Sequence, residues 1–153
     1  MIRNVIIFIK APRVGLVKRR LSADIGFQES WCFYRRAVRY LISEIALDPH
    51  WRCFLAVTPD NFVGNEPFWP IKCNVYKQGT GDLGERMRRV MANLLPEPTI
   101  LIGGDIPDIR NQHIATAFNA LGEYDAVFGP SNDGGYWLVG VSRQAVLSNL
   151  FKG

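Results

Sequence analysis

The length of 153 residues predicts one domain, which would bury roughly 70% of the surface of its unfolded chain. The 48% hydrophobic and 21% charged residues are typical of a globular protein and exclude a disordered chain. The net charge of +4 indicates an anionic partner, either a nucleotide, a nucleic acid or a membrane surface. The sequence contains neither a run of ~18 apolar residues nor a signal peptide, so we expect no membrane partner and a cytoplasmic protein.

The first two elements are predicted from apolar patterns. Val5–Ile9 is a continuous apolar run, which is typical of a strand covered on both faces. A basic loop follows over Lys10–Leu16, and Val17–Leu21 is expected to begin a short helix. Apolar residues at helical spacing over Phe27–Leu47 then predict a long amphipathic helix that ends before Pro49.

Shorter elements alternate along the rest of the chain. Strands are predicted at Phe54–Val57, Ile71–Tyr76, Thr99–Ile102, Asp125–Phe128 and Tyr136–Val141. Helices are predicted at Leu83–Leu95, capped by Asp82, and at Asn111–Leu121. This alternation predicts a single α/β domain over residues 1–153, with a mostly parallel sheet and helices on both faces. Only a short segment follows the last predicted strand, and from this we expect a form truncated at its C-terminus.

The loop from Lys10 to Arg20 is the first candidate site, because it holds five cations within eleven residues. It follows the first strand at its carboxyl end, which is the edge where open α/β sheets bind ligands. Gly15 allows the backbone to approach a phosphate closely, and Lys18 with Arg19 or Arg20 supplies positive charge. The alternative is a solvated basic turn without a ligand, since the loop is neither a GxGxxG fingerprint nor a P-loop.

Asp105 is the second candidate, because it follows an apolar strand through Gly103 and Gly104. If the first and fourth strands are neighbours, its carboxylate stands at the same sheet edge as the basic loop. A carboxylate beside phosphates is a suitable ligand for Mg²⁺ or Mn²⁺. The alternative is that Asp105 stabilises a turn; for Asp108 we expect only a helix cap.

Two glycine-rich segments have both a structural and a functional interpretation. The segment Gln78–Met87 contains Thr80 and Asp82 as helix caps, but its glycines also suit contact with a base or a ribose. The segment Gly129–Trp137 predicts a hairpin turn on spacing alone. It could instead shape an acceptor pocket with Asp133 as a base or a metal ligand.

A nucleic-acid interface is the third alternative and is suggested by arginines. They lie on two separate predicted helices, at Arg35, Arg36 and Arg39 and at Arg86, Arg88 and Arg89. Two solvated helix faces are a simpler interpretation than one binding groove, and an aromatic-rich RNA-binding strand is missing from the sequence. We therefore expect no nucleic-acid partner. The three cysteines match no metal-binding spacing and are expected to be buried thiols in a reducing cytoplasm.

Taken in order, the four segments resemble those of small bacterial transferases of the glycosyltransferase-A type, the radical-SAM-associated transferases. These are related to the molybdenum-cofactor and phospholactate guanylyltransferases. The family shows a KxPxxGxVKTRL loop, a GDLGERM segment, a G(S/T)DxP metal motif and a DGGYxLxG stretch. The matching residues here are Lys10–Leu21, Gly81–Met87, Gly103–Pro107 and Asp133–Gly140.

The resemblance implies a three-layer α/β/α nucleotide-diphospho-sugar transferase-like fold with a mixed, mostly parallel sheet. It implies a nucleotide site made by Lys10, Pro12, Gly15, Lys18, Arg20, Gly81, Asp82 and Gly84. Gly134, Gly135 and Tyr136 would lie on the acceptor side. Lys18, Asp105 and Asp133 would be catalytic, and Asp105 would bind Mg²⁺ or Mn²⁺.

The expected function is metal-dependent nucleotidyl or glycosyl transfer from a nucleoside triphosphate or a nucleotide-sugar to a small-molecule acceptor. Two departures from the family pattern stand against it. Arg19 replaces the usual threonine, and family members continue into an acidic segment near their C-terminus. The alternative is therefore a nucleotide-binding protein with impaired catalysis. The donor base, the acceptor and the oligomeric state are left open by the sequence.

Overall fold

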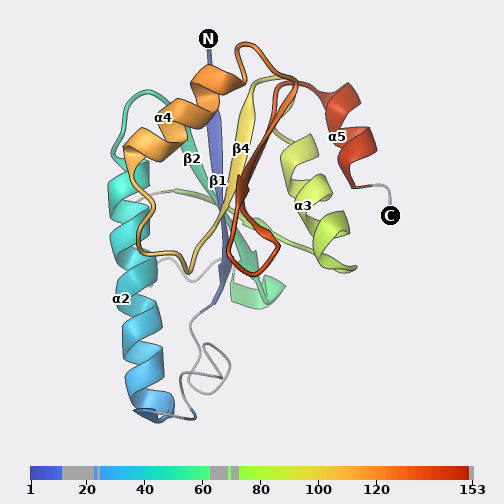
Figure 1. Cartoon of the computed structure of the whole chain (residues 1–153). Coiled ribbons are helices and arrows are strands. Elements are labelled where there is room, and N and C mark those ends of the chain that lie inside the picture. Colours follow the sequence, from blue (N-terminus) through green and yellow to red (C-terminus); the bar gives the residue numbers. More distant parts are fainter. Residues whose placement is uncertain (12–22, 24, 63–68, 70–72, 152–153) are drawn as a thin grey trace.

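The computed structural model describes residues 1–11, 23, 25–62, 69 and 73–151. Its centre is a six-stranded sheet in the order β3-β2-β1-β4-β6-β5 (Figure 1). The strands are β1 (Asn4–Lys10), β2 (Arg52–Thr58), β3 (Asn74–Lys77), β4 (Thr99–Gly103), β5 (Ala126–Pro130) and β6 (Tyr136–Val141). The helices are α2 (Phe27–Ala46), α3 (Leu83–Ala92), α4 (Asn111–Ala120) and α5 (Gln144–Leu150), with a 3₁₀ turn η1 at Asp60–Phe62.

The sheet is mixed, as the resemblance implied. Strand β1 pairs in parallel with β2 and β4, and β2 pairs in parallel with β3. Strand β6 runs antiparallel to both β4 and β5. The predicted adjacency of the first and fourth strands is therefore confirmed, with Ile7 opposite Ile102 in the register.

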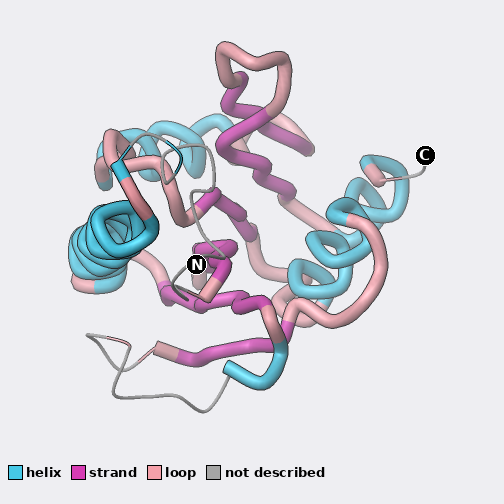
Figure 2. The backbone as a smooth tube through the Cα atoms, turned by 90° about the horizontal axis from the view of Figure 1, so that it is seen from below, coloured by secondary structure: helices cyan, strands magenta, loops and turns pink. Residues whose placement is uncertain are grey.

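Helices cover both faces of the sheet, so the three-layer α/β/α prediction is confirmed. Helices α2 and α4 lie on one face, and α3 and α5 lie on the other (Figures 1 and 2). The central strand β1 supplies apolar side chains to both layers: Ile7 packs in the cluster under α2 and α4, and Ile6 packs in the one under α3 and α5. Burial on both faces explains why β1 is a continuous apolar run instead of an alternating one.

Some element boundaries differ from the predicted ones. Helix α3 ends at Ala92 and not at Leu95, and β5 extends to Pro130. Helix α5 was not predicted, because its seven residues are too few for a clear helical period. The predicted helix at Val17–Leu21 and the start of the strand predicted at Ile71 lie outside the described residues.

Gly104 lets the end of β4 lie directly against β1. Its amide donates a hydrogen bond of 3.0 Å to the carbonyl oxygen of Phe8. A Cβ atom at this position would lie 2.8 Å from Cγ1 of Ile9 and 3.1 Å from the Phe8 carbonyl oxygen. Backbone cannot move aside as a flexible side chain can, so a larger residue would push the Gly103–Asp105 segment away from β1.

We expect Gly104→Ala to lower the free energy of unfolding by about 2 kcal/mol, because the added methyl group overpacks a buried contact. Denaturant unfolding measures this change. Gly84→Ala is the matched control: its Cβ would lie 3.4 Å or more from its neighbours. As a helical residue, Gly84 should tolerate alanine without loss or with a gain of up to about 1 kcal/mol. If Gly104→Ala and Gly84→Ala had the same free energy of unfolding, this would contradict the close approach of Gly104 to β1.

Candidate functional site

The candidate segments meet at one edge of the sheet. Strands β1 to β4 are parallel, so Lys10, Gln78 and Asp105 follow strands that end at the same side. Because β6 is antiparallel to β4, it begins at this side with Tyr136. The hairpin between β5 and β6 therefore lies at the same edge as the carboxyl ends of the parallel strands (Figure 1).

Tyr34 fixes the start of the basic loop. Its hydroxyl group donates a hydrogen bond of 2.6 Å from α2 to the carbonyl oxygen of Lys10. Burial and the negative charge of Asp105 both raise the pKa of Tyr34, which keeps its hydroxyl protonated and donating. Asp105 therefore lies close to the point where the basic loop begins. The Lys10 and Asp105 side chains are exposed.

Four residues expected in the basic loop lie outside the described residues. They are Pro12, Gly15, Lys18 and Arg20. Their part in a phosphate site remains a prediction.

Gln78 ties the ends of three strands together. It is 1% exposed, and its Nε2 atom donates hydrogen bonds to the carbonyl oxygens of Ile9, at 3.1 Å, and Ala56, at 2.9 Å. Its main-chain amide donates to the carbonyl oxygen of Val57 at 3.3 Å. A buried carboxamide with these partners holds the ends of β1, β2 and β3 in fixed positions.

Two arginines of α3 extend this network. Arg86 donates from Nη1 to Oε1 of Gln78 at 2.9 Å, and Arg89 donates from Nη1 to the Gln78 carbonyl oxygen at 2.7 Å. Arg89 also reaches the carbonyl oxygen of Thr80 from Nη2 at 2.8 Å. These charged donors connect α3 to the segment between β3 and α3. The spacing of the sequence did not reveal these partners, so Gln78 had no predicted role and both arginines were expected on a solvated helix face.

Asp82 caps α3 as predicted. Its carboxylate accepts a hydrogen bond of 2.8 Å from the amide of Glu85, whose Oε2 accepts one of 2.8 Å from the amide of Asp82. This reciprocal pair is a capping box, and it places the N-terminus of α3 after Gly81, whose φ is 105°. The segment that includes Gly81, Asp82 and Gly84 thus presents the positive end of the α3 dipole at the candidate edge.

The segment around Asp133 forms the hairpin turn predicted from its spacing. Oδ1 of Asp133 accepts hydrogen bonds from the hydroxyl group of Ser131 and from the amide of Gly135, the latter at 3.0 Å. These bonds, above all the one from Ser131, lower the pKa of Asp133. The side chain is fully exposed and ionised at neutral pH, which suits a metal ligand better than a general base. The turn passes through Gly134, whose φ of 88° lies in the region that favours glycine.

Tyr136 begins β6 directly after this turn. It is 62% exposed, and its ring centre lies 4.9 Å from that of Phe128 on the neighbouring strand β5. An exposed aromatic pair beside a glycine turn provides an apolar surface next to the ionised Asp133.

The donor chemistry at this edge suits a hard divalent cation. Asp105 follows β4 and Asp133 precedes β6, and these strands are neighbours. Mg²⁺ is commonly held by one or two carboxylates together with phosphate oxygens and water. Within the described residues, no group of three or more histidine, cysteine, aspartate or glutamate side chains could hold a metal by itself. The residues therefore fit a metal that shares its ligands with a bound phosphate.

Two expectations about other charged residues can be compared with the structure. The expectation that Asp108 caps the next helix is wrong: the N-cap of α4 is Arg110, whose amide donates to Nδ1 of His113 at 3.0 Å. The helix starts at Asn111 as predicted, and Asp108 lies two residues before the N-cap. The two arginine groups lie on α2 and α3, which cover opposite faces of the sheet, so they do not form one groove.

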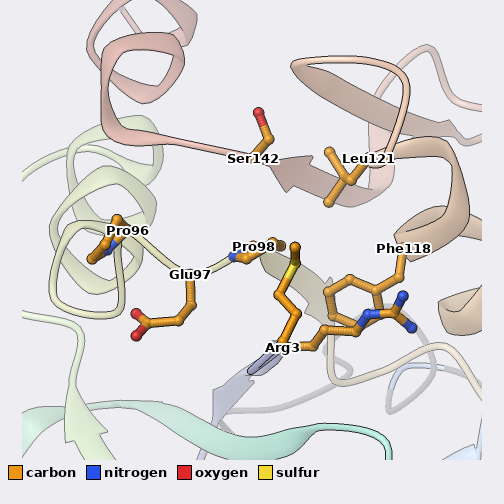
Figure 3. A pocket seen from close by; sticks show the side chains of 9 residues that line it. Arg3, Pro96, Glu97, Pro98, Phe118, Leu121 and Ser142 are labelled. Carbon is orange, nitrogen blue, oxygen red and sulfur yellow. The ribbon is translucent and has the colours of Figure 1, made fainter.

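A separate hollow of about 490 Å³ lies at the opposite edge of the sheet (Figure 3). It is lined by Arg3, Glu97, Phe118 and Ser142, among others. The guanidinium of Arg3 lies 5.3 Å from the centre of the Phe118 ring. Among the predicted site residues that the structure describes, none lines this hollow.

We expect Gln78→Ala to lower the free energy of unfolding by about 2–3 kcal/mol, because buried carbonyl groups and Arg86 lose their partner. Thermal or denaturant unfolding measures the loss. The same substitution at Gln112, an exposed residue of α4, is the control and should change stability by less than about 0.5 kcal/mol. A small effect at Gln78 would show that the network does not hold the strand ends.

The fold matches several solved structures. A protein of Desulfovibrio desulfuricans G20, provisionally named a nucleotide-diphospho-sugar transferase, is 30% identical with a TM-score of 0.90, over 99% of this chain and 68% of that one. The 4-diphosphocytidyl-2C-methyl-D-erythritol synthase of Anaerococcus prevotii DSM 20548 is 11% identical with a TM-score of 0.62, over 98% and 74%. A manganese complex from Mycobacterium tuberculosis H37Rv is 13% identical with a TM-score of 0.59, over 99% and 76%. The transferase-like fold class is confirmed.

Further comparisons concern the membrane, the curated proteins and the family. Across the part of the chain that the structure describes, no helix has the length and hydropathy needed to cross a membrane. No curated protein matches the chain. A family model described as "Uncharacterized protein conserved in bacteria (DUF2064)" matches residues 41–153. The chain belongs to this family.

Proposed function

We propose that this protein is a metal-dependent transferase that binds a nucleoside triphosphate or a nucleotide-sugar at the carboxyl edge of its sheet. The observation that carries the proposal is that the start of the basic loop, Asp105, the N-terminus of α3 and the Asp133–Tyr136 turn all lie at this edge. Such an edge is the usual ligand site of open α/β sheets. The name of the Desulfovibrio relative points to the same chemistry.

The nucleotide phosphates would be held by positive charge from two directions. Lys10, Lys18 and Arg20 of the basic loop would supply one set of charges, and Pro12 and Gly15 of the same loop would contact the nucleotide. The first amides of α3, including that of Gly84, are directed to the same edge by the capping box of Asp82. Charge neutralisation of this kind lowers the energy of a transition state in which negative charge builds up on the phosphates.

Asp105 would hold Mg²⁺ or Mn²⁺, with Asp133 as a second carboxylate. A bound divalent cation would supply further neutralisation of the phosphate charge. Gly134, Gly135 and Tyr136 would contact the acceptor, whose hydroxyl or phosphate group attacks the activated phosphorus or anomeric carbon. The protein would contribute chiefly by positioning the two reactants and by holding charge close to them.

Calorimetry with a panel of nucleotides and nucleotide-sugars, each with and without Mn²⁺, tests the proposal. GTP belongs in the panel because of the resemblance to guanylyltransferases, and CTP because of the diphosphocytidyl synthase neighbour. Product analysis with sugar phosphates and alcohols as acceptors follows for each donor that binds. Binding with turnover supports a transferase; binding without turnover supports the nucleotide-binding alternative; no binding contradicts both.

We expect Lys18→Ala to weaken nucleotide binding by about 1.5–3 kcal/mol, or roughly 10- to 150-fold in Kd, because a charged hydrogen bond to phosphate is lost. Titration calorimetry measures the change. Arg143→Ala is the control, because it removes one positive charge at the other end of the sheet, after β6. Equal effects of the two variants would mean that only the net charge matters, and Lys18 would not belong to the site.

We expect Asp105→Asn to abolish the dependence of nucleotide affinity on Mn²⁺ while the fold is unchanged, because an amide is a weaker ligand for a hard cation. Calorimetry over a range of Mn²⁺ concentrations, with circular dichroism for the fold, measures both. Asp108→Asn, three residues away and also exposed, should keep the dependence of the unmodified protein. A persistent Mn²⁺ response in Asp105→Asn would remove Asp105 from the metal site.

A further inference from the structure

Two of the three cysteines lie side by side on neighbouring strands, far apart in sequence. Cys53 is in β2, and Cys73 immediately precedes β3. The register of the parallel pair places Phe54 opposite Asn74, so Cys53 and Cys73 stand opposite each other one position earlier. Neighbouring strands lie about 4.8 Å apart, within the Cα separation of about 4.4–6.8 Å that a disulfide requires.

Both side chains also point to the same face of the sheet. Cys53 and Cys73 pack against the apolar cluster under α2 and α4, as does Val75, two residues after Cys73. Phe54 and Tyr76, at alternate positions, pack against the cluster on the other face. The side chains of a strand alternate between faces, so the two thiols share one side of the sheet.

The thiols are in direct contact and differ in reactivity. The hydrogen bond between the two thiols, followed by burial, raises the pKa of Cys53. The same hydrogen bond lowers the pKa of Cys73 and outweighs the opposite effect of its burial. Cys73 is therefore the better thiolate, and it is half-buried instead of fully enclosed. The expectation of buried thiols needs correction here, because Cys32, Cys53 and Cys73 are all partly exposed.

We propose that Cys53 and Cys73 form a reversible intramolecular disulfide when the protein meets a hydroperoxide. The Cys73 thiolate attacks one oxygen of the O–O bond and becomes a sulfenic acid. The other oxygen leaves as an alkoxide, or as hydroxide from hydrogen peroxide, and is protonated to an alcohol or to water. The Cys53 sulfur then attacks the Cys73 sulfur, the S–S bond forms, and the sulfenic oxygen leaves as water. In total, two thiols lose two electrons and two protons, and one hydroperoxide is reduced.

The bond would close the long connection between β2 and β3, which contains η1 and Trp69. Strand β3 leads directly to Gln78, so the modification ties together the two strands whose ends this residue bridges. Reduction by a dithiol would restore both thiols.

The experiment treats the full chain with hydrogen peroxide, then alkylates it under denaturing conditions and maps its peptides by mass spectrometry. We expect two thiols to be lost, a mass lower by about 2 Da before alkylation, and one linked peptide pair that contains Cys53 and Cys73. Dithiothreitol should return both thiols. Cys32 should remain a thiol during peroxide treatment and then be alkylated, because it lies on α2 and not at this pair of strands.

Matched serine variants make the result specific. Cys32→Ser should form the same link as the unmodified chain, whereas Cys53→Ser and Cys73→Ser should form no intramolecular link. Any of four results would overturn the proposal. These are three alkylated thiols after peroxide treatment, oxidation of single cysteines to sulfinic acid, a link through Cys32, and links only between chains. Circular dichroism before and after peroxide confirms that the reacting protein is folded.

Discussion

The buried carboxamide of Gln78 is the interaction on which the candidate edge depends. A polar side chain that is 1% exposed must find hydrogen-bond partners inside the protein, and here it finds them at the ends of β1 and β2 and on α3. These bonds fix where the parallel strands stop. The loops that follow the strands start from a rigid frame, so the proposed phosphate, metal and acceptor residues can be held in a constant arrangement.

The charged residues at this edge of the sheet have different roles. Arg86 is charged but donates a hydrogen bond to the Gln78 side chain, and Arg89 donates one to the Gln78 carbonyl oxygen. Asp82 is charged but serves the start of α3. Asp105, which follows β4, and Asp133, which precedes β6, are exposed carboxylates of the kind that a hard cation takes as ligands. Asp133 combines both kinds of role, because its carboxylate also accepts the hydrogen bonds that shape its turn.

The sequence was informative where the pattern of apolar residues has one physical meaning. The run Val5–Ile9 is covered on both faces, the spacing over Phe27–Leu47 matches α2, and Asp82 caps α3 as its type and place suggest. It was misleading for Asp108, because cap geometry depends on where the preceding loop turns into α4. Helix α5 is too short for a period, and the partners of Gln78 are distant in sequence, so neither was predictable.

The sequence by itself determined the class of fold, the order of the strands and of helices α2 to α4, and the segments that carry candidate chemistry. Each of these follows from local patterns of apolar residues, glycines and charges. Only the tertiary structure decided that β6 lies between β4 and β5, that Asp105 lies near Tyr34 and the start of the basic loop, and that Cys53 faces Cys73. These facts depend on which strands pair and in which register, and pairing is settled by packing of residues far apart in the chain.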